Sequence, residues 1–331
     1  MSAFILNRWY GSPGILRVLI PLEWLYRMVV AGRRLAYARG WIRRVDLPVP
    51  VIVVGNISVG GTGKTPVVEA LCRHLQARGW HPGIVSRGYA SERSDPRPVQ
   101  GQQAHLCGDE PLLLANRLGV PVYVGVDRVK VVQRLLQDCP QLDIVLSDDG
   151  LQHLAMNRQL EVVVLDGQRL LGNGHCLPVG PLREPASRLR EKQLQLVIHG
   201  TPNACWPDAS LMVLRQLPLR SVRPGDPLCF PSPPARIAAV AGVGNPARFF
   251  MQLRDLGYEV EEYPFPDHHP YSTADFIEID KPVLMTEKDA VKCREIAPQG
   301  SVYMPVEAAI SLDFWWYLDN RLETWRHPNA G

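Results

Sequence analysis

The feature that most constrains the fold is an apolar run that ends in a glycine-rich turn, VIVVGNISVGGTGKTPVVEALCRHL. We predict a strand over Pro50–Gly55 and a helix over Pro66–Arg78, with Gly63-Lys64-Thr65 where the helix opens. Glycines in such a turn let backbone N–H groups point inward around phosphate oxygens, where a side chain would collide. The helix N-terminus adds a dipole that favours anions. The segment therefore predicts a phosphate-binding loop.

The polar residues of this loop have distinct expected roles. Lys64 would reach the β- and γ-phosphates of a nucleotide, and the Thr65 hydroxyl would bind Mg²⁺. The usual motif begins with a glycine five residues before the Gly-Lys pair, where this chain has Ser58. A chance glycine turn is the alternative, but the flanking strand and helix favour a nucleotide site. The predicted nucleotide-binding residues are Gly60, Gly61, Thr62, Gly63, Lys64 and Thr65.

A second segment supplies the carboxylates that a P-loop site needs for Mg²⁺. A short strand over Asp143–Ser147 leads directly into Asp148 and Asp149. At the end of a neighbouring strand, either carboxylate could bind the metal directly or through water. Asp-Gly is also common in turns, which is the alternative interpretation. The doubled acid after an apolar run favours the metal role without deciding between the two residues.

The body of the chain alternates short apolar runs with helical stretches, the order expected of a parallel sheet covered by helices. The apolar runs are mostly continuous, which indicates strands buried on both faces. Further predicted elements are the strands Gly83–Ser86, Val120–Val124, Glu161–Asp166 and Leu194–His199 and the helices Glu110–Leu118 and Asp127–Gln137. The sequence thus predicts an α/β fold: a P-loop NTPase-type core with a mostly parallel sheet, plus a second, smaller α/β domain.

A proline-rich stretch separates the two predicted domains and is typical of a linker. The second unit is expected to contain the strands Arg236–Val240, Glu259–Tyr263, Pro282–Met285 and Val302–Pro305 and a helix near Pro246–Leu256. The predicted organisation is an N-terminal segment over 1–40, a P-loop domain over 41–217, a linker over 218–234 and a smaller C-terminal domain over 235–331.

The N-terminal segment is both apolar and basic. Residues 1–50 carry eight arginines, no lysine and two acidic residues, whereas the whole chain has a formal net charge of +3. The longest uncharged stretch, Trp9–Leu16, is too short to span a bilayer. Leu22, Leu25 and Val29 recur near helical spacing among the arginines. This pattern predicts either a helix in the interface of an anionic membrane or a helix packed on its own domain with a solvated basic face.

Composition and the spacing of motif residues disfavour several other classes of protein. Seven cysteines without a C-x-x-C pair fit neither a disulfide framework nor a zinc site. Nucleic-acid binding is unsupported, because the basic excess is confined to an apolar segment without a recognition motif. The guanine-reading motif of GTPases needs its lysine one place earlier than in Thr286-Glu287-Lys288-Asp289. Partition-type ATPases carry a lysine where this chain has Val59, so that class is also disfavoured.

Several short motifs occur in order along the chain: GNISVGGTGKTP at 55–66, SRGY at 86–89, GDEP at 108–111, DDGLQH at 148–153, PVGPLREP at 178–185, DHH at 267–269 and TEKDAVK at 286–292. Together they resemble the tetraacyldisaccharide 4′-kinases, the lipid A pathway kinases of Gram-negative bacteria. The resemblance runs from the N-terminal segment to about residue 292.

This resemblance implies transfer of the γ-phosphate of ATP to the 4′-hydroxyl of a tetraacyldisaccharide 1-phosphate, which gives lipid IVA. It implies ATP and Mg²⁺ as cofactors, a glycolipid substrate, and an active site between two α/β domains. It also implies peripheral attachment to the cytoplasmic face of the inner membrane, which favours the membrane interpretation of residues 1–40.

The resemblance makes Asp109 the base for the attacking hydroxyl and His268 the imidazole that pairs with it. Such a dyad can orient the carboxylate and adjust its basicity. Without the family, Asp109 would be a helix N-cap and His268 an exposed loop residue. Arg183 suits the γ-phosphate because a planar guanidinium matches phosphate oxygens, and Glu184 suits the metal region. The alternative for these last two residues is a surface ion pair.

Two other functions remain open at this point. One is a P-loop ATPase that couples hydrolysis to movement or assembly, and the other is a nucleotide switch at the membrane without a lipid acceptor. Thr286–Asp289 is expected in the second domain, where contact with the nucleotide across the cleft is one possible role.

Overall fold

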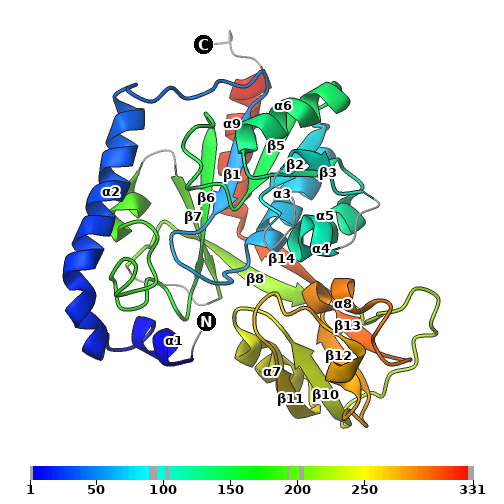
Figure 1. Ribbon diagram of the computed structural model, residues 1–331. Coiled ribbons are helices and arrows are strands. Elements are labelled where there is room, and N and C mark those ends of the chain that lie inside the picture. Colours follow the sequence, from blue (N-terminus) through cyan, green and yellow to red (C-terminus); the bar gives the residue numbers. More distant parts are fainter. Residues whose placement is uncertain (1–2, 89–94, 101–103, 192–193, 201–204, 327–331) are drawn as a thin grey trace.

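The computed structural model describes residues 3–88, 95–100, 104–191, 194–200 and 205–326. These residues form two sheets that belong to two neighbouring domains (Figure 1). The larger sheet has nine strands in the order β14-β8-β7-β6-β1-β5-β2-β4-β3, and the smaller has five in the order β11-β10-β12-β13-β9. The non-sequential order in both sheets is that of crossover connections between parallel strands.

The centre of the large sheet is parallel and buried, as the continuous apolar runs predict. Its parallel strands are β1 (Val51–Gly55), β2 (Pro82–Ser86), β4 (Val122–Val124), β5 (Ile144–Asp148), β6 (Leu160–Asp166), β7 (Leu194–His199) and β8 (Ser210–Gln216). Two antiparallel strands, β3 (Arg97–Pro98) and β14 (Val306–Ile310), close its edges. All the residues of β1, β5 and β6 are buried.

Helices cover both faces of this sheet. On one face, α3 (Lys64–Ala77), α5 (Asp109–Leu118) and α9 (Leu312–Arg326) contribute side chains to the same core as Ile52 and Val54 of β1. The short helix α4 (Ala104–Cys107) adds to this layer. On the other face, α6 (Arg128–Asp138) packs with the alternate β1 residues Val51 and Val53. Burial on both faces fixes the position of β1, and with it the loop that follows.

The smaller sheet is also covered on both faces. Its parallel strands are β10 (Arg236–Ala241), β11 (Glu259–Pro264), β12 (Val283–Thr286) and β13 (Val302–Met304), with β9 (Arg220–Ser221) antiparallel to β13. One face packs against α7 (Pro246–Asp255). The other packs against α8 (Glu287–Cys293) and the 3-10 helix η3 (Thr273–Phe276). The second α/β unit is therefore present as predicted from the sequence.

The predicted boundaries of this second domain are wrong at its C-terminal end. After β13 the chain returns to the large sheet, where β14 pairs antiparallel with β8. Phe314, Leu318 and Leu322 of α9 then bury their side chains in the core of the large domain. The strand β9 also lies within the predicted linker 218–234. Strand pairing is a long-range contact, so a local apolar pattern could not reveal which sheet would accept the last strand.

The N-terminal residues form α1 (Ala3–Trp9), the 3-10 helix η1 (Gly14–Leu19) and the long helix α2 (Ile20–Ala38), which runs along one side of the large domain (Figure 1). Polar anchors hold α2 on the body of the protein. Buried Glu23 accepts hydrogen bonds from His175 Nδ1 at 2.7 Å and Cys176 N at 2.9 Å, and the Tyr26 hydroxyl donates to the Arg183 carbonyl at 2.8 Å.

The outer surface of α2 is apolar. Leu22, Trp24, Leu25, Met28 and Val29 are each more than half exposed. The helix α2 thus lies against its own domain through Glu23 and Tyr26, as the second alternative predicts, but these five apolar side chains do not pack there. Among the helices of the described ranges, none combines the length and hydropathy needed to cross a bilayer.

The return of the C-terminus gives a stability prediction. Phe314 is fully buried in the large core, so Phe314→Ala should lower the free energy of unfolding by about 3–5 kcal/mol. Trp316 is 72% exposed on the same helix and serves as the control. Urea unfolding should separate Phe314→Ala from Trp316→Ala, and equal stability of the two variants would contradict the docking of α9.

Candidate functional site

The loop after β1 has the backbone that the glycine pattern predicts. Gly60 and Gly63 have φ angles of 115° and 89°, which residues with a Cβ rarely adopt. Ser58, which replaces the first glycine of the usual motif, is buried. Its backbone N and its hydroxyl both donate to Asn56 Oδ1, at 2.9 and 3.1 Å. Val59 N donates to the Pro181 carbonyl at 2.9 Å. These contacts fix Ser58 and Val59 at the beginning of the loop.

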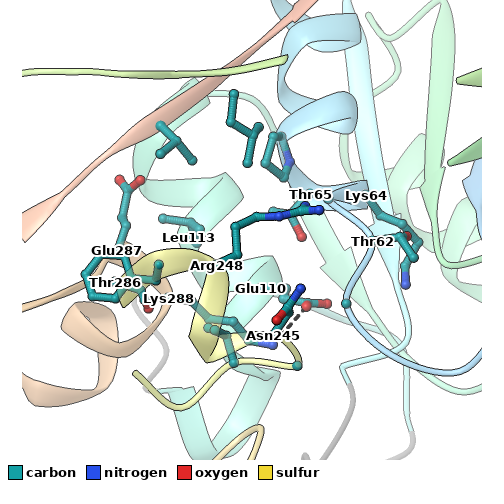
Figure 2. Close-up of a pocket in the computed structure, with 18 of the residues that line it drawn as sticks. Thr62, Lys64, Thr65, Glu110, Leu113, Asn245, Arg248, Thr286, Glu287 and Lys288 are labelled. Carbon is teal, nitrogen blue, oxygen red and sulfur yellow. Dashed lines mark hydrogen bonds and ion pairs between the residues drawn. The ribbon is translucent and has the colours of Figure 1, made fainter. Parts of the chain in front are cut away.

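A cavity of about 230 Å³ lies between this loop and the small domain (Figure 2). Lys64 and Thr65, at the start of α3, line one side of it, and Asn245 and Arg248 of the small domain line another. Lys288, from the TEKD sequence, also contributes to the wall. The remaining wall has an apolar part, formed by Leu113, Leu214, Val243, Phe249, Met304 and Val306. Such a mixture of charged and apolar surface suits a ligand with a polar and an apolar end.

The two acidic residues after β5 lie next to the loop but differ in environment. Val54 of β1 pairs with Asp148 of β5, so the ends of these strands are adjacent. Asp148 is buried, and neither of its carboxylate oxygens has a hydrogen-bond partner among the described residues. Burial, together with the charge of Glu110, raises the Asp148 pKa to about 7. An unpartnered buried carboxylate indicates a position that a cation would stabilise.

Asp149 is instead surrounded by cations. Its carboxylate lies 3.5 Å from Lys64 Nζ and 3.3 Å from Arg183 Nη1. Burial alone would raise its pKa, but Lys64 and Arg183 outweigh that effect and lower it. Asp149 has a positive φ of 48°, a conformation that Asp adopts more readily than most residues. The pKa is thus raised for Asp148 and lowered for its neighbour Asp149.

Asp109 and His268 meet across the two domains. His268 Nδ1 lies 3.0 and 3.1 Å from the two Asp109 carboxylate oxygens. Gly108, rather than Asp109, is the N-cap residue of α5, so the N-cap alternative for Asp109 is wrong. His268 has a side chain only 20% exposed, so it is no freely exposed loop residue either. The structure therefore brings together the two residues of the predicted dyad.

Two lysines of α8 complete the environment of this dyad. Lys288 Nζ and Lys292 Nζ each lie 3.8 Å from Asp109 Oδ2. Burial would raise the Asp109 pKa, but the His268 hydrogen bond and the lysine charges lower it to about 2. Burial would lower the His268 pKa, but the hydrogen bond to Asp109 outweighs it and raises this pKa. Asp109 is therefore ionised at neutral pH and held in one orientation.

Arg183 and Glu184 do not form an ion pair with each other. Arg183 faces Asp149, whereas the Glu184 carboxylate lies 2.7 Å from Arg34 Nη1 of α2 and 3.3 Å from Arg188 Nε. In the described part of the chain, no group of three or more His, Cys, Asp or Glu side chains is arranged to hold a metal ion. The Glu184 carboxylate is therefore paired with two arginines and also accepts a hydrogen bond from Gln152 Nε2 at 2.8 Å.

Sequence reasoning missed several polar residues of this site. Arg117 lies 2.9 Å from both Glu69 Oε2 and Glu287 Oε2, which joins α3, α5 and α8. Lys288 was part of the predicted Thr286–Asp289 segment, but its contacts with Glu110 at 3.0 Å and Asp267 at 3.1 Å were not predicted. The TEKDAVK motif indicated that this segment is functional, whereas Arg117 lies in none of the sequence motifs and could not be predicted from them. Tyr89 of SRGY lies outside the described residues.

A phosphate-binding loop and an acidic strand end on adjacent parallel strands place the chain in the P-loop class of nucleotide-binding proteins. The family model of tetraacyldisaccharide-1-P 4′-kinase matches residues 15–323. Tetraacyldisaccharide 4′-kinase of Methylobacillus flagellatus is 46% identical over 321 residues, with coverage of 93% of this chain and 92% of that protein. The chain therefore belongs to the tetraacyldisaccharide-1-phosphate 4′-kinase family.

Two further proteins extend this comparison. Tetraacyldisaccharide 4′-kinase of Alkalilimnicola ehrlichii is 51% identical over 296 residues, which cover 88% of this chain and 87% of that protein. The crystal structure of LpxK from Aquifex aeolicus in complex with ATP is similar, with a TM-score of 0.76 and 28% identity. That similarity covers 94% of this chain and 99% of the other.

The Asp109–His268 contact predicts a pH-dependent contribution to stability. Because the His268 pKa is raised in the folded protein, the stabilisation is complete below its unfolded value and is lost as pH rises through the folded value. His268→Ala should therefore destabilise the protein more at about pH 5 than at about pH 8. Urea unfolding at both pH values tests this, with His105→Ala, an exposed histidine, as control. An equal loss at the two pH values would contradict the contact.

Proposed function

We propose that this chain transfers the γ-phosphate of ATP to the 4′-hydroxyl of tetraacyldisaccharide 1-phosphate and so forms lipid IVA in lipid A biosynthesis. The observation that carries the proposal is the dyad of Asp109 and His268, with atoms 3.0 Å apart, beside a cavity lined by Lys64 and Thr65. In support of the proposal, Glu110, the residue after Asp109, lines the same cavity as the phosphate loop. Family membership identifies the acceptor.

Mg²⁺ fits this site on the chemistry of its residues. The two Asp148 oxygens are buried and lack a protein partner in the described ranges, and carboxylate and hydroxyl oxygens are suitable ligands for this ion. Asp148 and the Thr65 hydroxyl would hold it, which selects Asp148 over the ion-paired Asp149 as the direct ligand. When bound, Mg²⁺ neutralises charge on the phosphate oxygens.

In the proposed reaction, Asp109 orients the 4′-hydroxyl and accepts its proton. A loose phosphoryl-transfer transition state requires little nucleophilic assistance. The base must therefore above all be ionised and correctly placed, and its low pKa ensures ionisation. His268 holds the carboxylate in place. The proton leaves the hydroxyl oxygen as that oxygen bonds to the γ-phosphorus, and the bond from this phosphorus to the β–γ bridging oxygen breaks.

Lys64 and Arg183 would stabilise the charge of the transferring phosphate. Both face Asp149 in the structure, at 3.5 and 3.3 Å. A phosphate oxygen offers each cation a second negative partner, and a planar guanidinium can bind two such oxygens at once. We therefore assign Asp149 the role of holding these cations beside the phosphate position. Glu184 would hold Arg34 and Arg188 instead of the metal.

We further propose that the chain attaches peripherally to the cytoplasmic face of the inner membrane through α2. Trp24 and Met28 are each 64% exposed, and Leu22, Leu25 and Val29 lie on the same helix. Apolar side chains on an interfacial helix enter the region between headgroups and acyl chains, while arginines attract anionic lipids. This placement would bring the glycolipid substrate to the protein from the membrane.

The reaction is tested by incubating the pure protein with γ-labelled ATP, Mg²⁺ and tetraacyldisaccharide 1-phosphate. We expect the label in an organic-soluble product whose mass has increased by a single phosphate. Lys64→Ala should abolish transfer, whereas Lys130→Ala, which removes a lysine that is 71% exposed, should not. Label found only in inorganic phosphate would instead support an ATPase, and no turnover at all would support a nucleotide switch.

The role of Asp109 is tested by Asp109→Asn. We expect kcat to fall on the order of 10²–10⁴-fold, the usual range for a lost general base, with ATP affinity nearly unchanged. In a second variant, His268→Ala, the Asp109 pKa should rise because the hydrogen bond that lowers it is gone. The acidic limb of the kcat/KM profile should then move to higher pH. Equal losses of kcat and ATP affinity in Asp109→Asn would remove this residue from the base role.

A further inference from the structure

Arg248 extends from the first turn of α7 in the small domain to the large domain. Its Nη2 donates to Asp166 Oδ1 at 3.0 Å, and its Nη1 lies 2.7 Å from His199 Nδ1. Asp166 and His199 are the last residues of the parallel strands β6 and β7. The side chain is only 16% exposed. Arg248 is thus fixed at the carboxyl edge of the large sheet, where open α/β sheets bind ligands.

Of these two contacts of Arg248, only the one with Asp166 is with an anion. Burial, with the charge of Arg248, lowers the His199 pKa to about 4, so the imidazole is neutral at neutral pH and accepts the hydrogen bond. The Asp166 oxygen that faces Arg248 also accepts from the backbone N–H groups of Gln168 at 2.9 Å and Arg169 at 3.2 Å. A guanidinium that shares one carboxylate oxygen and meets a neutral imidazole can still bind an anion strongly.

Two close approaches place this guanidinium beside the phosphate loop. A Cβ added to Gly63 would lie 3.4 Å from His199 Nδ1, the atom that faces Arg248. A Cβ added to Gly244 would lie 2.7 Å from Gly61 N, so the turn before α7 touches the loop itself. Figure 2 shows Arg248 extending from α7 towards the start of α3, where Lys64 and Thr65 lie.

We propose that Arg248 is a phosphate-binding residue of the nucleotide site, contributed by the small domain. Its planar guanidinium binds phosphate oxygens of ATP from the side opposite Lys64, in place of the contact with neutral His199. Asp166 remains to orient the side chain. The small domain then contacts the phosphate groups directly through Arg248. The nucleotide lies between Lys64 of the large domain and Arg248 of the small domain. This inference rests on the nucleotide site proposed above.

A purely structural role is the competing explanation, because Arg248 also connects the domains. Other contacts provide that connection without it. Arg169 Nη1 donates to the Gly244 carbonyl at 3.0 Å, and Arg117 lies 2.9 Å from Glu287 Oε2. A structural clamp would affect every ligand of the cavity equally, whereas a phosphate contact affects only phosphorylated ligands. The two roles therefore differ in a measurable way.

The experiment compares the affinities of ATP and adenosine for three variants of the full chain. Arg248→Ala should weaken ATP binding by on the order of tenfold or more, as expected for a lost charge-assisted hydrogen bond, and leave adenosine binding unchanged. Arg248→Lys keeps the charge but not the planar fork, so it should restore part of the ATP affinity. Arg254→Ala, an arginine of the same helix that pairs with Glu262, is the control.

The outcomes separate this inference from the proposed function. Equal weakening of ATP and adenosine, or unchanged ATP affinity in Arg248→Ala, would overturn the phosphate contact. If Arg248→Ala does not fold, Arg248→Lys must still lose ATP affinity selectively and raise the KM for ATP without changing the KM for the lipid. A wild-type chain that binds ATP but phosphorylates no lipid would contradict the proposed function and leave the Arg248 measurement interpretable.

Discussion

The parallel pairing of β1 with β5 is the constraint on which the site depends. Val54 lies opposite Asp148, so the strand that ends in the phosphate loop and the strand that ends in the acidic pair finish at the same sheet edge. Both strands are fully buried, and a shift of register would expose apolar residues and separate the acid from the loop. The same strand pairing thus buries apolar residues in the core and sets the position of the acidic pair beside the loop.

The second requirement is that two domains meet at this edge. The dyad has its carboxylate on α5 and its imidazole in the small domain, and Arg248 crosses the boundary in the opposite direction. The chain itself passes between the domains and returns through β14, whose pairing with β8 anchors the end of the small domain to the large sheet. The charged groups at this boundary therefore come from both domains.

The sequence allowed prediction of those parts of the site that lie on continuous segments. The phosphate loop and the pair of acids each follow an apolar run directly, so pattern and chemistry coincide there. The return of β14 could not be predicted, because its partner β8 is remote in sequence. The contacts of Glu184 show the same limit: its motif gave no sign that Arg34, about 150 residues earlier in the sequence, lies 2.7 Å from its carboxylate. Arg248 belongs to none of the sequence motifs, and its contacts with Asp166 and His199 depend on the fold.

We propose that the loop at 60–65 and Asp148 together hold the triphosphate and its metal ion. The most direct measurement is a crystal structure of this chain with Mg²⁺ and a nonhydrolysable ATP analogue. We predict phosphate oxygens on the loop amides and Lys64, with the metal ion between the Thr65 hydroxyl and an Asp148 oxygen. A nucleotide bound elsewhere, or an Asp148 carboxylate that faces away from the ion, would contradict this account.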